Sequence, residues 1–495
     1  MRLKESTLLQ TRAFIGGLWV DSLSSEKFNV CDPASGEILA SVAKCDERDA
    51  VEAVEAAAAA LPIWQAKSPK ERAAIMLRWS ALIEAHIDDL AAICTAEQGK
   101  PLAESRGEIL HGASYIDWFA AEGQRVYGDV NTGPTDDMRV VCIKQSVGVV
   151  ACITPWNFPS AMLTRKLSAA LAAGSTIICK PATQTPLSAL ALCELARRAG
   201  IPDGVINVVQ GNANQLGAVM TSHPLIRKVT FTGSTAVGKQ IQRDSASTVK
   251  RLSLELGGNA PFIIFDDVDL DVAVQGAIIS KFRNAGQTCV CANRILVQDT
   301  IYNEFLDRFA VAADALSVGA GGDEGVEMGP LVSAAAVQNT RNFLDDALRN
   351  GAKIRTRRDP FCHQPNFFNP VVLSNVDRSM RVFREEIFGP LAPVLPFRSE
   401  QEAVDMANDT EYGLASYLYT RDIGRVWRVC EALDFGMVGL NSPILSNETA
   451  PFGGVKQSGQ GREGSRYGLD DYLEIKYICM GGIEASESKG SLSTH

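Results

Sequence analysis

Two cysteines flank Val290 in the stretch 281–294, which reads KFRNAGQTCVCANR. Cys289 and Cys291 come after a segment of helical periodicity that Gly286 interrupts. A cysteine on a polar loop, with arginines nearby, is a candidate nucleophile because cations favour the reactive thiolate. Most cysteines are buried and structural, but the loop favours a chemical role for Cys289.

Glu255 and Asn157 are two polar residues that suit such a nucleophile. Glu255 precedes two glycines where one α/β pattern gives way to another, so it is a candidate general base. Asn157 follows an apolar strand and is a candidate donor to an oxyanion. The plainer alternatives are an exposed glutamate and a cap for the helix that begins near Pro159.

The segment 233–240, GSTAVGKQ, follows a strand and opens a helix. It nearly matches a P-loop, but Gln240 stands where a Mg²⁺-binding Ser or Thr is required, which argues against phosphoryl transfer. Its free amides can still hold a pyrophosphate, although a plain helix N-terminus is the alternative. The sequence G-x-G-x-x-G at 459–464 comes too late in the chain to open a βαβ unit.

Lys180 and Thr183 follow another strand, where a cofactor ribose or phosphate would lie. An acidic residue at such a position repels a 2′-phosphate, whereas Thr183 is neutral and donates a hydrogen bond. We therefore favour NADP, with NAD possible.

The composition is that of a soluble globular protein with two or three domains, at 495 residues and a net charge of −10. Neither nucleic acid nor a membrane is an expected partner. The N-terminus lacks the pattern of a signal or transit peptide, and twelve cysteines occur without a dense framework, so we expect a cytoplasmic protein with reduced thiols. The five histidines are isolated, and no metal site is expected.

Strands alternate with helices over 148–254 and again after 257, which predicts an α/β fold with two Rossmann-like parallel-sheet domains. One helical segment is expected over 69–97. The predicted organisation is a dinucleotide-binding domain at 1–126 and 146–256, a catalytic domain at 257–470, oligomerisation β segments at 127–145 and 471–483, and a disordered tail at 484–495. The β segments suggest a homodimer or homotetramer.

Together these motifs resemble the aldehyde dehydrogenase superfamily. Seven segments occur in the order of that family between about residues 13 and 482, namely PWNFP at 155–159, KPA at 180–182, FTGST at 231–235, ELGG at 255–258, GQTC at 286–289, EEIFGP at 385–390 and PFGG at 451–454. Within the family, the stretches 281–293, 461–468 and 472–477 are similar to the succinate-semialdehyde dehydrogenase branch, in its bacterial NADP-accepting form more than its mitochondrial form.

The resemblance implies roles for individual residues. Cys289 would be the nucleophile, Glu255 the activating base, and Asn157 an oxyanion donor, while Lys166 and Glu463 would assist proton movement. Dinucleotide contacts are implied for Thr154, Pro155, Trp156, Lys180, Ala182, Thr183, Gly211, Phe231, Gly233, Ser234, Val237, Leu256, Glu386 and Phe388.

Three residues bear on the substrate. Arg165 and Arg283 should face the substrate channel, where two guanidinium groups would bind a carboxylate distal to the aldehyde. Ser446 matches a third carboxylate contact of the same branch. We therefore predict oxidation of a short ω-oxo acid, succinate semialdehyde first and glutarate semialdehyde or another aldehyde next.

Cys291 is either a redox-switch partner of Cys289 or a space-filling neighbour, and the sequence favours neither. Two other functions remain open. A cysteine hydrolase or acyl transferase would need Cys289 and Glu255 without redox turnover, and a non-catalytic protein would merely keep the fold.

Overall fold

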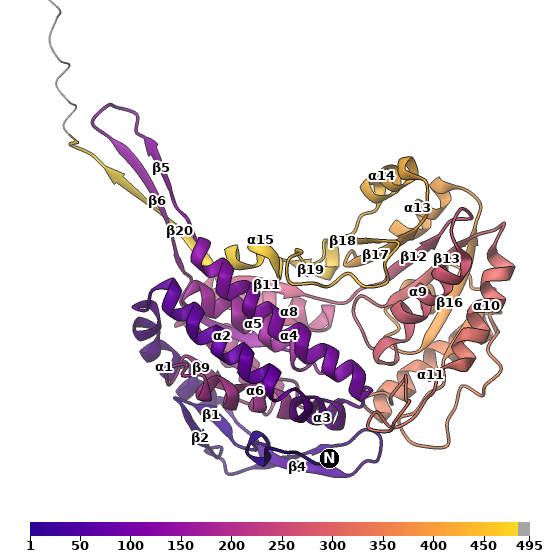
Figure 1. Cartoon of the computed structure of the whole chain (residues 1–495), viewed down its shortest axis with the longest axis horizontal. Coiled ribbons are helices and arrows are strands. Elements are labelled where there is room, and N and C mark those ends of the chain that lie inside the picture. Colours follow the sequence, from indigo (N-terminus) through magenta and orange to yellow (C-terminus); the bar gives the residue numbers. More distant parts are fainter. Residues whose placement is uncertain (484–495) are drawn as a thin grey trace, which may run out of the picture.

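The structure, a computed structural model, describes residues 1–483 (Figure 1). The predicted disordered tail, 484–495, lies outside the described residues. Within 1–483, no helix combines the length and the apolar character needed to cross a membrane.

An eight-stranded sheet, with strand order β19-β11-β10-β7-β8-β9-β1-β2, forms the first domain. Its five central strands run parallel, and β1 and β19 pair antiparallel at the two sides. The strands are β1 (Ala13–Ile15), β2 (Leu18–Val20), β7 (Val149–Ile153), β8 (Thr176–Lys180), β9 (Ile206–Val208), β10 (Ile226–Thr232), β11 (Arg251–Glu255) and β19 (Gly459–Gln460). A two-stranded ribbon, β3 (Lys27–Cys31) and β4 (Ile38–Ala43), lies beside this domain.

The order of these strands creates a switch point at β7. The chain runs from β7 to β8 and β9 on one side, and then returns to place β10 on the other side of β7. At such a point the two neighbouring crossovers diverge and leave a crevice at the carboxyl ends of the strands. The loops after β7 and β10 therefore face one ligand-sized space.

Helices cover both faces of the sheet because successive strand residues point to opposite sides. Val150 and Cys152 pack with α2 to α6, whereas Val149 and Ala151 pack with α1, α7 and α8. The helices are α1 (Glu47–Gln65), α2 (Pro69–Ala85), α3 (Ile87–Gln98), α4 (Leu102–Glu122), α5 (Ala161–Ala173), α6 (Leu187–Arg198), α7 (Ala213–Ser222) and α8 (Thr235–Ser245).

The single helix expected over 69–97 is two helices, so that prediction is wrong. His86 leaves the helical region, with φ −107° and ψ 20°, between α2 and α3. Asp89 in the first turn of α3 accepts hydrogen bonds from the backbone N–H groups of Lys4 and Glu5, at 2.7 and 2.9 Å. This docking of the N-terminal segment is a long-range contact that local periodicity does not reveal.

A second sheet, with order β14-β15-β16-β13-β12-β17-β18, forms the other domain, to the right in Figure 1. Its strands are β12 (Ala260–Ile264), β13 (Ala292–Gln298), β14 (Lys353–Ile354), β15 (Val371–Ser374), β16 (Leu391–Phe397), β17 (Ala415–Tyr419) and β18 (Met437–Leu440). Its helices are α9 (Leu270–Phe282), α10 (Tyr302–Ala315), α11 (Ala334–Arg349), α12 (Arg381–Arg384), α13 (Glu400–Asn408) and α14 (Ile423–Ala432).

The predicted end of the second domain at residue 470 needs correction. Strand β19 pairs with β11 of the first sheet, and α15 (Ser465–Asp470) contacts α4 and α5. The chain therefore returns to the first domain by residue 459. The two elements that make this return are too short to be recognised in the sequence.

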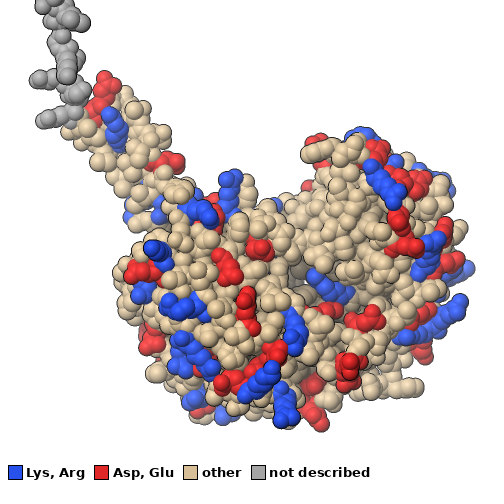
Figure 2. Space-filling view, viewed as in Figure 1, with Lys and Arg blue, Asp and Glu red and all other residues tan. Residues whose placement is uncertain are grey.

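A three-stranded arm projects from the first domain (Figure 1). Strand β20 (Leu473–Met480) pairs antiparallel with β6 (Arg139–Ser146), which also pairs with β5 (Asp129–Thr132). On β20, Ile475 is 72% exposed and Tyr477 59% exposed. Figure 2 shows charges of both signs mixed over the main body and a mostly uncharged arm. An apolar strand at the edge of a sheet is a pairing surface.

We therefore expect the arm to hold copies of the chain together. Ile475→Asp should lower the molar mass in solution, measured by light scattering after size-exclusion chromatography, because a buried unpaired carboxylate is unfavourable in an interface. Leu18→Asp is the matched control, since Leu18 is 66% exposed on β2 and lies away from the arm. A monomeric wild-type protein would contradict the expectation.

Candidate active site

The carboxyl ends of four parallel strands deliver the polar residues of the first domain. Asn157 follows β7, Gly233 follows β10, Lys180 ends β8 and Glu255 ends β11. Because β7 and β10 are neighbours at the switch point, Asn157 and Gly233 line one cavity. The parallel sheet thus brings together residues that are far apart in the sequence.

Cys289 lies between two cavities, of about 280 and about 290 Å³, and lines both. It follows a 3₁₀ turn, Arg283–Gly286, in which Asn284 and Ala285 have left-handed backbones with φ 52° and 55°. Such backbones are costly for residues other than glycine and persist only when their surroundings hold them. The turn therefore holds the Cys289 thiol where one ligand can reach it from each of the two cavities.

The cavity of about 280 Å³ is lined by several of the residues predicted to contact a dinucleotide. Phe388 and Trp156 meet edge to face with ring centroids 5.5 Å apart, and Glu386 accepts a hydrogen bond from the Gly258 N–H at 2.9 Å. A Cβ at Gly257 would lie 2.5 Å from the Glu386 carboxylate, so a larger residue there would displace that carboxylate. The cavity is lined by Pro155, Trp156, Asn157, Phe158, Met162, Thr232, Gly233, Ser234, Leu256, Gly257, Cys289, Glu386 and Phe388.

Within residues 1–483, the remaining residues predicted to contact a dinucleotide do not line this cavity. Thr183 and Val237 are exposed, and Lys180 is buried with its Nζ donating to the Pro181 carbonyl at 3.1 Å. Gly211 packs on the Cys45 backbone, where a Cβ would meet the Cys45 carbonyl at 2.3 Å. Thr154, Phe231 and Ala182 are also absent from the lining.

The second cavity brings together all three predicted substrate residues. Arg165, Arg283 and Ser446 line it with Cys289. The other lining residues are Glu104, Gly107, Glu108, His111, Phe158, Ala161, Met162, Thr288, Val290, Ile444 and Phe452. Two guanidinium groups and a hydroxyl therefore share a small enclosure with the thiol.

His111 is a member of this cavity that the sequence did not indicate. Arg165 donates to the Ser446 hydroxyl at 3.0 Å and lies 3.4 Å from Nε2 of His111, which is 3.1 Å from the same hydroxyl. Burial, and then the charges of Arg165 and Arg283, lower the pKa of His111 to about 3. A neutral imidazole beside a guanidinium accepts at Nε2, so we infer the Nδ1–H tautomer.

Arg283 is the freer of the two arginines. Its guanidinium lies over the Phe158 ring, 5.5 Å from the centroid, and forms no ion pair within residues 1–483. Arg165 by contrast pairs with Glu463 and lies between the rings of Tyr115 and Phe452. An unpaired, half-buried cation in a cavity favours an anionic ligand.

Glu463 and Lys166, the two residues predicted to move protons, are paired with each other. It forms a short ion pair with Lys166 and a second one with Arg165 at 3.3 Å. Burial opposes ionisation, but Lys166 and Arg165 together keep the pKa of Glu463 below its ordinary value. Both carboxylate oxygens of the buried Glu255 have no hydrogen-bond partner among the described residues.

The resting thiol is protonated, contrary to the expectation of a lowered pKa. Burial, and then the Glu386 carboxylate, raise the pKa of Cys289 to about 12. Burial, and then Glu463, raise the pKa of Glu255 well above its ordinary value. Desolvation outweighs the arginines here, because the charged form of each group loses its water. Thiol and carboxyl are both neutral until a ligand or a proton transfer changes them.

Cys291 and Arg294 take structural positions in the same loop. The Cys291 thiol is buried and donates to the carbonyl of Lys281 at 3.1 Å. Arg294 lies in β13, and its guanidinium donates to the carbonyls of Asn259, Met406 and Ala407. It has no contact with the thiol. Whether Cys291 acts as a redox switch stays a prediction.

We expect alkylation of Cys289 by iodoacetamide, with neither ligand bound, to accelerate about tenfold per pH unit from pH 7 to 9. Only the thiolate reacts, and below a pKa of about 12 its fraction rises tenfold per unit. Tandem mass spectrometry of the Cys289 peptide gives the rate, and the exposed Cys31 is the internal control for accessibility. A rate independent of pH between 6 and 9 would show a pre-formed thiolate.

Comparison with known proteins agrees with this geometry. The model of the Aldehyde dehydrogenase family matches residues 19–478. The chain is 55% identical to 3-sulfolactaldehyde dehydrogenase of Pseudomonas putida, over 98% of this chain and 100% of that protein. It is 53% identical to glutarate-semialdehyde dehydrogenase of Pseudomonas aeruginosa, with the same coverage. It is also 53% identical to succinate-semialdehyde dehydrogenase [NADP(+)] of Escherichia coli, over 97% and 100%.

The fold is shared with solved structures as well. The crystal structure of succinate-semialdehyde dehydrogenase from Burkholderia pseudomallei is similar with a TM-score of 0.96 and 54% identity, and covers 97% of this chain and 100% of that one. The fold of two parallel-sheet domains is thus matched over nearly the full length of the chain. The chain belongs to the aldehyde dehydrogenase family.

Proposed function

We propose that this aldehyde dehydrogenase oxidises a short aldehyde with a distal anionic group, succinate semialdehyde first and glutarate semialdehyde next. The observation that carries the proposal is that Arg165, Arg283, Ser446 and Cys289 line one cavity of about 290 Å³. An anion bound by the arginines leaves the other end of a short chain at the thiol. The names of the relatives share this feature, since succinate, glutarate and 3-sulfolactaldehyde all carry an acid group.

The residues around the other cavity fit a nicotinamide dinucleotide. Ser234 is the N-cap of α8, whose first turn has no side-chain cap and leaves backbone amides for a pyrophosphate, although the Gly233 N–H itself donates to the Glu255 carbonyl at 3.0 Å. Glu386 and Phe388 close the end beside Cys289. When bound there, the oxidised nicotinamide supplies the hydride acceptor. We propose NADP as the favoured cofactor and NAD as possible, because Lys180 ends β8, the neutral Thr183 follows it, and a relative is named for NADP(+).

The chemistry follows from the proposed roles of this chain's own residues. Glu255, once ionised, takes the proton of the Cys289 thiol as the sulfur adds to the aldehyde carbon, and the Asn157 amide donates to the oxygen that becomes negative. Glu255 then passes this proton on before it acts as a base again. Loss of hydride from that carbon leaves a thioester on Cys289. Glu255 takes a proton from the water that attacks this thioester, and the acid leaves as the thiol is restored.

We propose that Lys166 and Glu463 provide the exit for the proton that Glu255 gains. Glu255 has a raised pKa and no hydrogen-bond partner among the described residues, so the proton it gains needs an exit. The nearby ion pair of Lys166 and Glu463 is buried and offers both a donor and an acceptor. A hydrolase or acyl transferase without redox turnover stays the alternative for the thiol chemistry, and the cavity beside Glu386 argues against it.

The substrate proposal is tested with Arg283→Ala on succinate semialdehyde and on butyraldehyde. Loss of one charged hydrogen bond costs about 1.5–3 kcal/mol, so kcat/KM for the acid should fall roughly 10- to 150-fold. Butyraldehyde lacks the acid group, and its kcat/KM should change less than about threefold. Arg283→Lys keeps the charge and should lose less. An equal loss on both aldehydes would contradict the carboxylate contact.

The cofactor proposal is tested with Thr183→Glu, which places a negative charge on the β8 loop. Repulsion of the 2′-phosphate should lower kcat/KM for NADP at least about tenfold, while kcat/KM for NAD changes less than about threefold. Thr183→Gln is the matched control, with similar size and no charge. Because Thr183 is exposed, neither variant should affect folding. Equal changes with both cofactors would refute the placement of the 2′-phosphate.

A further inference from the structure

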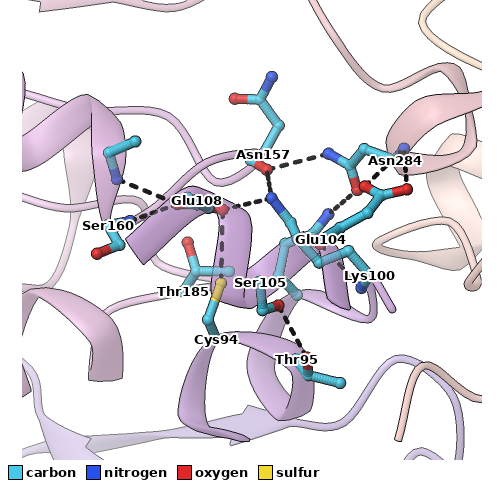
Figure 3. A network of polar contacts seen from close by, with 12 residues as sticks. Cys94, Thr95, Lys100, Glu104, Ser105, Glu108, Asn157, Ser160, Thr185 and Asn284 are labelled. Carbon is cyan, nitrogen blue, oxygen red and sulfur yellow. Dashed lines mark hydrogen bonds and ion pairs between the residues drawn. The ribbon is translucent and has the colours of Figure 1, made fainter. Parts of the chain in front are cut away.

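A buried ammonium group lies beneath the proposed oxyanion donor (Figure 3). Lys100, between α3 and α4, has a fully buried side chain whose Nζ donates to the Asn157 carbonyl at 2.6 Å. The same Nζ pairs with Glu108 at 2.5 Å and lies 3.7 Å from the centre of the Phe158 ring. Neither cavity is lined by Lys100, so it has no direct part in binding either ligand.

Glu108 links this ammonium to the start of α5. Its other oxygen accepts hydrogen bonds from the backbone N–H groups of Ser160 and Ala161, at 2.8 and 3.1 Å. Both ends of the loop from Asn157 to Ala161 are therefore held by one buried ion pair. A carboxylate at the first turn of a helix is also favoured by the helix dipole.

Asn284 holds the same carbonyl from the other domain. Its Nδ2 donates to the Asn157 carbonyl at 3.0 Å and lies 3.2 Å from the Gln287 carbonyl. The Asn157 side chain donates to that Gln287 carbonyl at 3.0 Å. Glu104 accepts the Asn284 N–H at 3.0 Å, and Gln98 donates to the Asn284 side chain at 2.9 Å. The loop that carries Cys289 is thus bonded to the loop that carries Asn157.

We propose that Lys100 and Asn284 are positioning residues that aim the Asn157 amide at the oxygen of the adduct on Cys289. This inference rests on the proposed oxyanion role of Asn157. Two donors on one carbonyl leave the Asn157 backbone little freedom, and they come from the α3–α4 corner and from the catalytic loop. Packed apolar residues are often as stabilising as a buried ion pair, so stability alone does not account for Lys100. Its directional bonds fix a position that apolar packing leaves less defined.

The test is a double-mutant cycle read by the single-turnover rate of reduced-cofactor formation, followed at 340 nm with aldehyde and NADP⁺. Asn157→Ala should slow this rate about 100-fold, as loss of one oxyanion donor does. Lys100→Met should slow it at least about tenfold, with KM for aldehyde and cofactor within about threefold. In the Asn157→Ala background, Lys100→Met should change the rate less than about twofold, because its effect acts through Asn157.

Asn284→Gly provides a second cycle that survives if Lys100→Met fails to fold. Glycine adopts the left-handed backbone of residue 284 without strain, so the variant loses the side-chain bonds and keeps the loop. It should slow the reaction at least about fivefold alone and less than about twofold in the Asn157→Ala background.

Glu97→Gln is the matched control. Glu97 is also a buried carboxylate at a helix start, and it accepts the N–H groups of Leu187 and Ser188 at 2.7 and 2.8 Å. It has no bond to Asn157, so this change should alter thermal stability and leave the single-turnover rate within about twofold.

The outcomes distinguish the oxyanion role of Asn157 from the positioning roles of Lys100 and Asn284. If Asn157→Ala keeps the wild-type rate, the oxyanion role itself is wrong and the inference falls with it. If Asn157→Ala is slow but the effects of Lys100→Met and Asn284→Gly multiply with it, the oxyanion role stands and the positioning role is overturned.

Discussion

One sulfur atom must face two ligands at once, and the structure depends on this constraint. Cys289 lines the cavity proposed for the dinucleotide and the cavity proposed for the aldehyde, so its loop must lie where the two domains meet. The left-handed backbones of Asn284 and Ala285 turn the chain there, and hydrogen bonds to Glu104 and Gln98 of the first domain hold the turn. The position of the nucleophile is therefore a property of the junction rather than of either domain.

The charges around the thiol fall into satisfied and unsatisfied groups. Lys100, Glu108, Lys166 and Glu463 are buried and paired, so they maintain geometry. Glu255 has no hydrogen-bond partner among the described residues, and Arg283 forms no ion pair there. A buried polar group without a partner costs free energy that a ligand or a proton can recover. Glu255 and Arg283 thus stand where chemistry and substrate recognition are proposed.

Local sequence signals predicted a helix or strand correctly where the residues of that element alone determine it. The helical segment expected from residue 69 begins there as α2, and the β segment expected at 471–483 contains β20, which pairs with β6. Predictions failed where a distant contact decided the outcome. The helix that begins just after the break at His86 binds the N-terminal segment through Asp89, and residues 459–460 pair with β11 of the first sheet. The raised pKa of Cys289 likewise depends on burial by both domains.

The sequence by itself determined the family and the two α/β halves. It also singled out Cys289, Glu255 and the two arginines, because family motifs that occur in a fixed order identify the residue types that follow the strands. Only the tertiary structure decided which of these share a cavity. It placed His111 between Arg165 and Ser446, which no motif contains, and it set Lys100 and Asn284 on one carbonyl oxygen. The reason is physical: hydrogen bonds and desolvation act over a few ångströms, and folding alone brings residues so far apart in the chain within that distance.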